Sequence, residues 1–188
     1  MKSIEELVEE ASHDMFNPVL NFDIAEKYSE LNQTASAVSF YLRAAEYGAE
    51  SHPLIAYTSL LKMSICFADQ RDRTKTVLNN ILQAIALAPT RPEGYFFLSR
   101  YYEQLGSWQE CYTTACMGLA WSFDEEHMPP LPSDIEYYGP YVLTFEKAVS
   151  SWWIGRQEES RALFKELDLM ELDPKYRASV ESNLSNIL

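Results

Sequence analysis

The apolar residues of this chain recur at intervals of three and four, which is the spacing of helices that bury one face. One such run consists of Val77, Leu78, Ile81, Leu82 and Ile85, and no long stretch alternates with the period of two expected of a strand. The pattern predicts ten helices, over residues 3–12, 18–31, 34–48, 53–70, 74–88, 92–105, 108–121, 137–154, 157–170 and 174–187. The expected fold class is therefore all-α.

The predicted helix starts carry capping residues. Three Ser–Glu pairs have the capping-box spacing, in which each side chain accepts a hydrogen bond from a free backbone amide: Ser3 with Glu6, Ser107 with Glu110, and Ser133 with Glu136. Prolines stand where a first turn can begin, at Pro53, Pro92, Pro140 and Pro174, and Asp173 fits an N-cap. Residues 122–136, rich in prolines and acids, are instead expected to form an irregular loop that is functional or mobile.

The second helix of each of four predicted pairs repeats the same pattern. Successive copies are offset by 40, 34 and 49 residues in three slots: Ala37, Val77, Cys111 and Ser160; Tyr41, Ile81, Ala115 and Phe164; Ala44, Ala84, Gly118 and Leu167. The first helices align on a large–small pair: Ile24–Ala25, Met63–Ser64, Leu98–Ser99 and Lys147–Ala148. Asn32, Gly106 and Gly155 lie in the turns and tolerate the left-handed conformation. Small slots allow close helix approach, and aromatic slots fill the remaining space.

This register resembles the tetratricopeptide repeat over roughly residues 18–172, with the best copy at Tyr95, Leu98, Ser99, Tyr102, Gly106 and Trp108. The fourth copy departs most, because Lys147 replaces the large residue and Ser151 the tyrosine. The resemblance implies a right-handed α-α superhelix of about four helix pairs in one domain, 1–188, with an acidic N-terminal helix within 1–17 and a capping helix over 173–188. On that last helix Val180, Leu184, Ile187 and Leu188 share a side, and terminal repeats require such a cap.

Residues 91–184 also resemble helical arrays associated with bacterial and phage glycosyltransferases. The resemblance lies in the helix pair from Arg91 to Trp108, the proline-rich loop after it, the aromatic pair Tyr137–Tyr138 and the closing helix with Asn183. It implies an accessory role that positions a transferase or its acceptor.

Composition narrows the classes of partner. The net charge of −13 disfavours nucleic acid and favours a partner with basic residues. No apolar run approaches the roughly 20 residues that span a bilayer, and no signal-peptide pattern is present at the N-terminus. The three cysteines do not form a disulfide framework, which predicts a cytoplasmic protein. The oligomeric state is left open.

No catalytic constellation is apparent, so we expect neither an enzyme nor a metal or cofactor site. His13, His52 and His127 lack ligand spacing, and the cysteines fit small core positions. The adjacent carboxylates Glu9–Glu10, Glu125–Glu126 and Glu158–Glu159 diverge on a helix and fit a solvated surface.

Repeat arrays of this type line a concave groove with their first helices. By that geometry the peptide-binding groove would contain Phe22, Glu26, Phe96, Arg100, Glu103, Phe145 and Trp152, together with Leu61, Glu146 and Trp153. Arg100 would anchor the peptide, and the alternative is that Phe96, Phe145 and Trp152 pack in the core. The lysine, asparagine and arginine of a carboxylate clamp are absent. The sequence predicts a non-catalytic protein-binding module. The alternatives are the glycosyltransferase accessory role and carbohydrate binding through Trp152, Trp153, Tyr137 and Tyr138.

Overall fold

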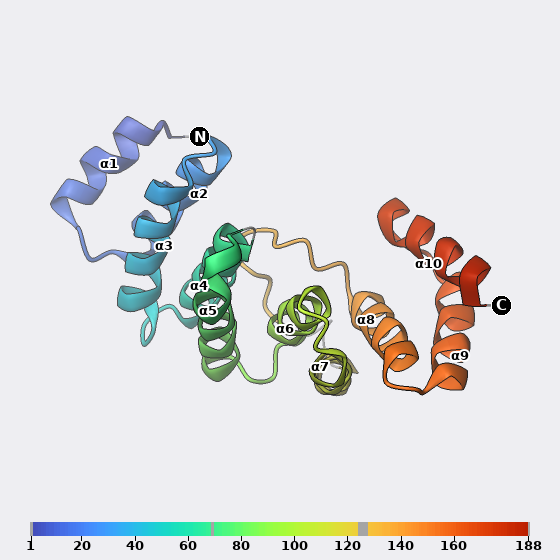
Figure 1. Cartoon of the computed structure of the whole chain (residues 1–188). Helices are drawn as coiled ribbons and strands as arrows, with labels where there is room; N and C mark the ends of the chain where they lie inside the picture. The colour runs from blue at the N-terminus through green and yellow to red at the C-terminus, as the bar shows by residue number, and fades with distance from the viewer. Residues whose placement is uncertain (1, 69, 124–127, 188) are drawn as a thin grey trace. The chain divides into compact units, whose positions relative to one another are not determined.

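A computed structural model describes residues 2–68, 70–123 and 128–187, apart from the side chains of residues 71 and 187. Within these residues the chain is helical and has no strand (Figure 1). It forms two compact units: Met1–Pro89 with Pro129–Ile135 (unit 1), and Thr90–Met128 with Glu136–Leu188 (unit 2). The single domain 1–188 stays a prediction.

Unit 1 contains the first two helix pairs, preceded by an N-terminal helix. Its elements are α1 (Ile4–His13), α2 (Pro18–Glu30), α3 (Thr34–Gly48), α4 (Pro53–Ala68), a 3-10 turn η1 (Arg71–Arg73) and α5 (Thr74–Leu87). Helices α2 and α3 pack as one pair and α4 and α5 as the next, and α3 packs on α4. The capping box that opens α1 is confirmed: the Glu6 amide donates to Ser3 Oγ, and the Ser3 amide donates to the Glu6 carboxylate.

Unit 2 contains the last two pairs and a C-terminal helix. Its elements are α6 (Pro92–Gln104), α7 (Trp108–Trp121), α8 (Pro140–Trp153), α9 (Gln157–Asp168) and α10 (Pro174–Ile187). Helix α7 packs on α6 and α8, and α9 packs on α8 and α10. A buried ion pair lies at the start of α6, where the Arg91 guanidinium donates to Glu93 Oε1 at 2.6 Å and Oε2 at 3.2 Å.

The repeat register is confirmed by burial. All twelve residues of the three second-helix slots are buried: Ala37, Tyr41 and Ala44 on α3; Val77, Ile81 and Ala84 on α5; Cys111, Ala115 and Gly118 on α7; Ser160, Phe164 and Leu167 on α9. Three of the pairs also turn through a left-handed residue, with φ of 56° at Asn32, 69° at Gly106 and 84° at Gly155. The same slots therefore form the interior of every pair.

Lys147 stands where the other copies of the repeat have a large apolar residue, and its surroundings explain the difference. Its ammonium lies 2.9 Å from Glu159 and over the Tyr112 ring. The Tyr112 hydroxyl donates to Glu159 at 3.1 Å and accepts from Arg156 at 2.8 Å. A polar network thus joins α7, α8 and α9 where other copies use a large apolar residue. Glu159 is half-buried, which corrects its assignment to the solvated surface.

One predicted helix start and two predicted capping boxes are wrong. Helix α8 begins at Pro140 and not at residue 137, because Gly139 has φ of 100° and breaks the helix before the proline. Ser133 and Glu136 therefore form no capping box, and Glu136 is itself left-handed at φ 59°. Ser107 precedes α7 as predicted but makes no capping hydrogen bond through its side chain. In contrast, the Lys175 amide donates to Asp173 Oδ1 at 2.9 Å, as the predicted N-cap requires.

The terminal helices close the two units. Leu7 and Ala11 of α1 pack against Ile24, and Val180 of α10 is buried against Phe164. Leu184 also contributes, whereas the side chains of residues 187 and 188 lie outside the description. Of the predicted loop over 122–136, residues 122 and 123 have 3-10 geometry and residues 128–136 are irregular, while Glu125, Glu126 and His127 lie outside the described residues.

Candidate functional site

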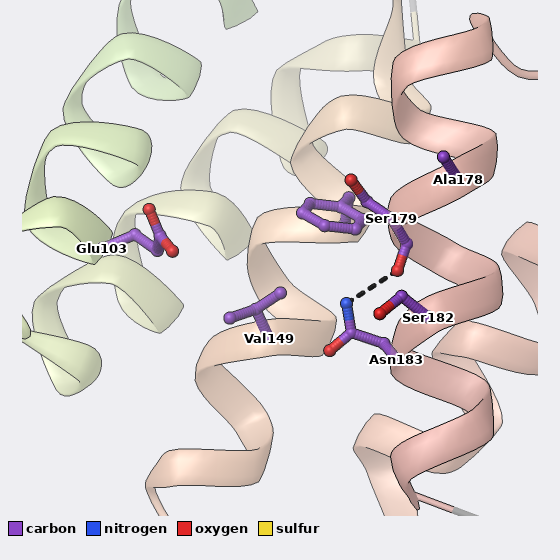
Figure 2. Close-up of a pocket in the computed structure, with 7 residues that line it drawn as sticks. Glu103, Val149, Ala178, Ser179, Ser182 and Asn183 are labelled. Atoms are coloured by element: carbon purple, nitrogen blue, oxygen red, sulfur yellow. Dashed lines mark hydrogen bonds between the residues drawn. The ribbon is translucent and has the colours of Figure 1, made fainter.

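Unit 2 contains a cleft of about 520 Å³ between α6, α8 and α10. Its lining is mixed: Glu103 comes from α6, Phe145 and Val149 from α8, and Ala178, Ser179, Ser182 and Asn183 from α10. Figure 2 shows the Glu103 carboxylate directed from α6 toward the side chains of α8 and α10. The cleft therefore combines an apolar wall, a carboxylate and a set of neutral hydrogen-bonding groups.

The neutral polar groups lie on one face of α10. Ser179, Ser182 and Asn183 are spaced by three and four residues, so a single helical face presents all three. Asn183 Nδ2 donates to the Ser179 carbonyl oxygen at 2.8 Å (Figure 2). This hydrogen bond orients the side-chain amide and leaves its Oδ1 atom as an acceptor.

The Glu103 carboxylate is half-buried, and desolvation raises its pKa while the charge of Arg100 opposes that rise. Arg100 lies on the same helix, with its guanidinium 5.9 Å from the Phe96 ring centroid. The Arg100 charge also acts on Glu146, a residue of α8 that is only 4% exposed. The positive charge of Arg100 therefore opposes the rise in pKa of both carboxyl groups, Glu103 and Glu146.

Glu146 lies in the interior of unit 2. Its Oε2 atom is 3.9 Å from the Cys111 thiol, a weak donor, and its carbonyl oxygen accepts from Ser150 at 2.7 Å. Burial, and then the negative charge of Glu103, raise the pKa of Glu146 to about 8. Burial also raises the pKa of the Cys111 thiol to about 12, so this pair holds its protons at neutral pH. Added positive charge in the cleft would favour the ionised carboxylates.

The structure brings two of the predicted groove residues together in this cleft, Glu103 and Phe145. Four others are corrected, because they are buried and cannot line a groove: Phe22 at 3% exposure, Leu61 and Phe96 at 0%, and Glu146 at 4%. Phe22, Leu61, Phe96 and Phe145 occupy the same slot, two residues before the large position. The slot faces the core, as the rings adjoining Phe22 (Tyr41) and Phe96 (Tyr137) show. Phe145 is half-buried at the cleft edge, where its ring contacts Tyr176.

Glu26 is positioned separately, in unit 1. Its carboxylate accepts from the Tyr41 hydroxyl and lies 3.4 Å from the Lys62 ammonium of α4. Burial and the hydrogen bond to Glu26 raise the pKa of Tyr41, so the phenol remains a donor. Glu26 therefore links α2, α3 and α4 and contributes to the structure of unit 1.

The tryptophans of α8 lie apart from the cleft lining. Trp152 is half-buried, with the Arg161 guanidinium 5.5 Å from its ring. Trp153 is 60% exposed and stacks on Trp108 at 5.2 Å with an interplanar angle of 15°. Neither residue joins Glu103 and Phe145.

Sequence reasoning missed the contribution of α10, which it treated only as a cap. The signal was present in the i, i+3, i+4 spacing of Ser179, Ser182 and Asn183, on a face other than that of Val180. Across the described residues no group of three or more His, Cys, Asp or Glu side chains is arranged to hold a metal ion. None of the described helices is both long and apolar enough to cross a membrane.

Comparison with solved structures defines the fold. MamA matches over 97% of this chain and 89% of its own, with a TM-score of 0.66 and 11% identity. MamA from residue 41 onward, from Desulfovibrio magneticus RS-1, matches over 98% and 82%, with a TM-score of 0.58 and 11% identity. TTC0263, a thermophilic TPR protein of Thermus thermophilus, matches over 98% and 88%, with a TM-score of 0.57 and 12% identity.

No known family profile matches the chain, and no curated protein is detectably similar to it in sequence. The structural likenesses, all at low identity, concern the fold alone. Together with the buried repeat register, they show that this chain has the all-α fold of tetratricopeptide-type helical repeats.

Proposed function

We propose that this protein is a non-catalytic binding module that holds a peptide segment of a partner protein in the cleft of unit 2, through a lysine or arginine side chain. The observation that carries the proposal is the composition of the cleft: a single half-buried carboxylate faces apolar and neutral polar side chains.

A basic side chain matches this lining in both its parts. The aliphatic stem of lysine or arginine would lie along Phe145, Val149 and Ala178, while its cation would reach the Glu103 carboxylate. Burial raises the pKa of Glu103 and only the Arg100 charge opposes that rise, so a ligand cation would stabilise the ionised Glu103 carboxylate further. The serines and Asn183 would hydrogen-bond the peptide backbone.

Long-range electrostatics favour the same partner. The net charge of −13 attracts a basic segment and speeds its encounter with the protein. A cytoplasmic location, the glycosyltransferase accessory role and carbohydrate binding stay predictions from the sequence.

A positional-scanning library of nine-residue peptides tests this proposal on the full chain. We expect selection of lysine or arginine at one position, and Glu103→Gln should weaken binding of the selected lysine peptide about tenfold, since it removes one charge-assisted hydrogen bond. Glu110→Gln is the matched control, because it removes the same charge from an exposed position of α7 and should change affinity less than about twofold. A flat selection profile, or equal binding by the Glu103 variant and the wild type, would refute the proposal.

A further inference from the structure

A second surface of unit 2 combines stacked tryptophan rings with positive charge. Trp108, at the start of α7, and Trp153, at the end of α8, stack at 5.2 Å with an interplanar angle of 15°. Trp108 covers one face of the Trp153 ring, yet Trp153 is 60% exposed, so its other face is open to solvent. An open indole face can take a further ring, such as that of phenylalanine, by stacking and burial of apolar area.

The positive charge lies one helical turn away along α7. Tyr112 follows Trp108 by four residues, so both rings lie on the same face of the helix. The Arg156 guanidinium lies 4.7 Å from the Tyr112 ring centroid, and Lys147 Nζ lies 5.8 Å from the same centroid. We name Trp108, Tyr112, Lys147, Trp153 and Arg156 the tryptophan–arginine surface, and none of them lines the cleft.

The ion pairs of this surface leave an excess of positive charge. Lys147 and Arg156 share one carboxylate, that of Glu159, at 2.9 and 3.5 Å. Partial burial raises the pKa of Glu159, but the hydrogen bond and the charge of Lys147 lower it overall, so the carboxylate is ionised at neutral pH. Two cations therefore face one anion here, in a chain whose net charge is −13.

Arg156 keeps hydrogen-bond donors for a further anion. Its side chain is 56% exposed, and its hydrogen bonds to described residues both come from Nη1, to the Tyr112 hydroxyl at 2.8 Å and to Glu159 Oε2 at 3.5 Å. Its Nη2 and Nε groups can hold a carboxylate through two parallel hydrogen bonds. Because Tyr112 already positions the guanidinium, less side-chain entropy is lost when such a ligand binds.

We infer that the tryptophan–arginine surface binds an acidic peptide segment in which an apolar ring and a glutamate or aspartate lie two positions apart. The four residues from Trp108 to Tyr112 span about 6 Å of helix, and alternate side chains of an extended peptide lie about 7 Å apart. The peptide ring stacks on Trp153 while the carboxylate accepts from Arg156. Since the charge of this ligand is opposite to that proposed for the cleft, the two sites select different segments.

Fluorescence anisotropy with the full chain and a labelled nine-residue peptide tests this inference. The peptide has phenylalanine at its centre, glutamate two positions away on each side, and serine or glycine elsewhere, so both chain directions present the required spacing. We expect Arg156→Gln and Trp153→Ala each to weaken binding at least about fivefold. Arg43→Gln is the matched control, because Arg43 also lies over a ring, that of Phe40, but on α3 of unit 1. It should change the affinity less than about twofold, and so should Glu103→Gln in the cleft.

The wild-type chain decides the matter if the variants do not fold. A peptide with glutamine in place of both glutamates should bind at least about fivefold more weakly. The glutamate peptide should shift the indole N–H resonance of Trp153 more than that of Trp121, which lies at the opposite end of α7 from Trp108. Equal affinity of the two peptides, unchanged binding by a folded Arg156→Gln variant, or a larger shift at Trp121 would overturn the inference. Tighter binding of glucuronate than of the peptide would overturn it too, by indicating a site for an acidic sugar.

Discussion

Replacing Glu146 by glutamine should stabilise unit 2 at neutral pH. The carboxyl is only 4% exposed, has a thiol as its side-chain neighbour at 3.9 Å, and has a pKa raised to about 8 by burial and by Glu103. In the unfolded chain the same group ionises near pH 4.5. Between these two values folding requires Glu146 to take up a proton, which costs free energy.

The pH dependence of this stabilisation follows from the direction of the Glu146 pKa shift. Because the pKa is higher in the folded protein, the contribution of Glu146 to stability is complete below pH 4.5 and is lost as the pH rises toward 8. Glutamine keeps the shape without the charge. At pH 7.5 we expect the free energy of unfolding to increase on the order of 2 kcal/mol, and at pH 4.5 the variant and the wild type should agree within about 0.5 kcal/mol.

Denaturant titrations followed by tryptophan fluorescence report on the unfolding of unit 2, because all four tryptophans belong to it: Trp108, Trp121, Trp152 and Trp153. Glu110→Gln, at an exposed site on α7, should change stability by less than about 0.5 kcal/mol at either pH. A destabilising Glu146→Gln, or a gain that is the same at both pH values, would show that the carboxyl is not held protonated by its surroundings.

Gly118→Ala should destabilise unit 2 even though alanine is the better helix former. An added Cβ would lie 2.8 and 2.9 Å from the two Leu143 Cδ atoms and 2.9 Å from Tyr95 Cβ. Tyr95 Cβ is fixed to the backbone of α6 and cannot move aside. Overpacking costs about 1–3 kcal/mol, and three contacts under 3.0 Å place this site in the upper part of that range. After the gain in helix propensity of about 1 kcal/mol, we expect a net loss of up to about 2 kcal/mol.

A double-mutant cycle separates the steric cause from others. Leu143→Ala makes room beside residue 118, so the double variant should be less destabilised than the sum of the single changes by at least about 0.5 kcal/mol. Gly106→Ala is a control in the same unit, since its added Cβ meets no atom within 4 Å and only the φ of 69° opposes it. It should cost about 1 kcal/mol and show no coupling to Leu143. Additive effects of Gly118→Ala and Leu143→Ala would argue against the steric account.

The repeat register was predictable because it depends on local spacing. Ala37, Tyr41 and Ala44 recur at a fixed offset in the later copies, and each such slot faces the interior of a helix pair. The predicted helix starts at Pro53, Pro92 and Pro174 were also correct, because they follow from the backbone of proline alone, and the same rule places the start of α8 at Pro140 although the helix was predicted from residue 137.

The site was less predictable because it depends on how neighbouring pairs pack. Phe22, Phe96 and Phe145 occupy the same slot, and the sequence does not indicate whether a neighbouring helix covers it. In the structure Phe22 and Phe96 are buried, whereas Phe145 is half-buried. Glutamate usually lies at the surface, yet Glu146 lies on the buried face of α8. The cleft further requires α10, which lies more than seventy residues from Glu103 in sequence.

Methyl NMR of the full chain, titrated with the lysine peptide that ranks first in the library, examines binding at the cleft itself. Val149 and Ala178 line the cleft and supply methyl probes, while Val77 and Ala44 report on unit 1. We expect the Val149 and Ala178 resonances to shift with peptide concentration, the unit 1 resonances to stay in place, and the same peptide with norleucine for lysine to cause much smaller shifts. Equal shifts with norleucine, or shifts confined to unit 1, would contradict a cleft in unit 2 that recognises a basic side chain.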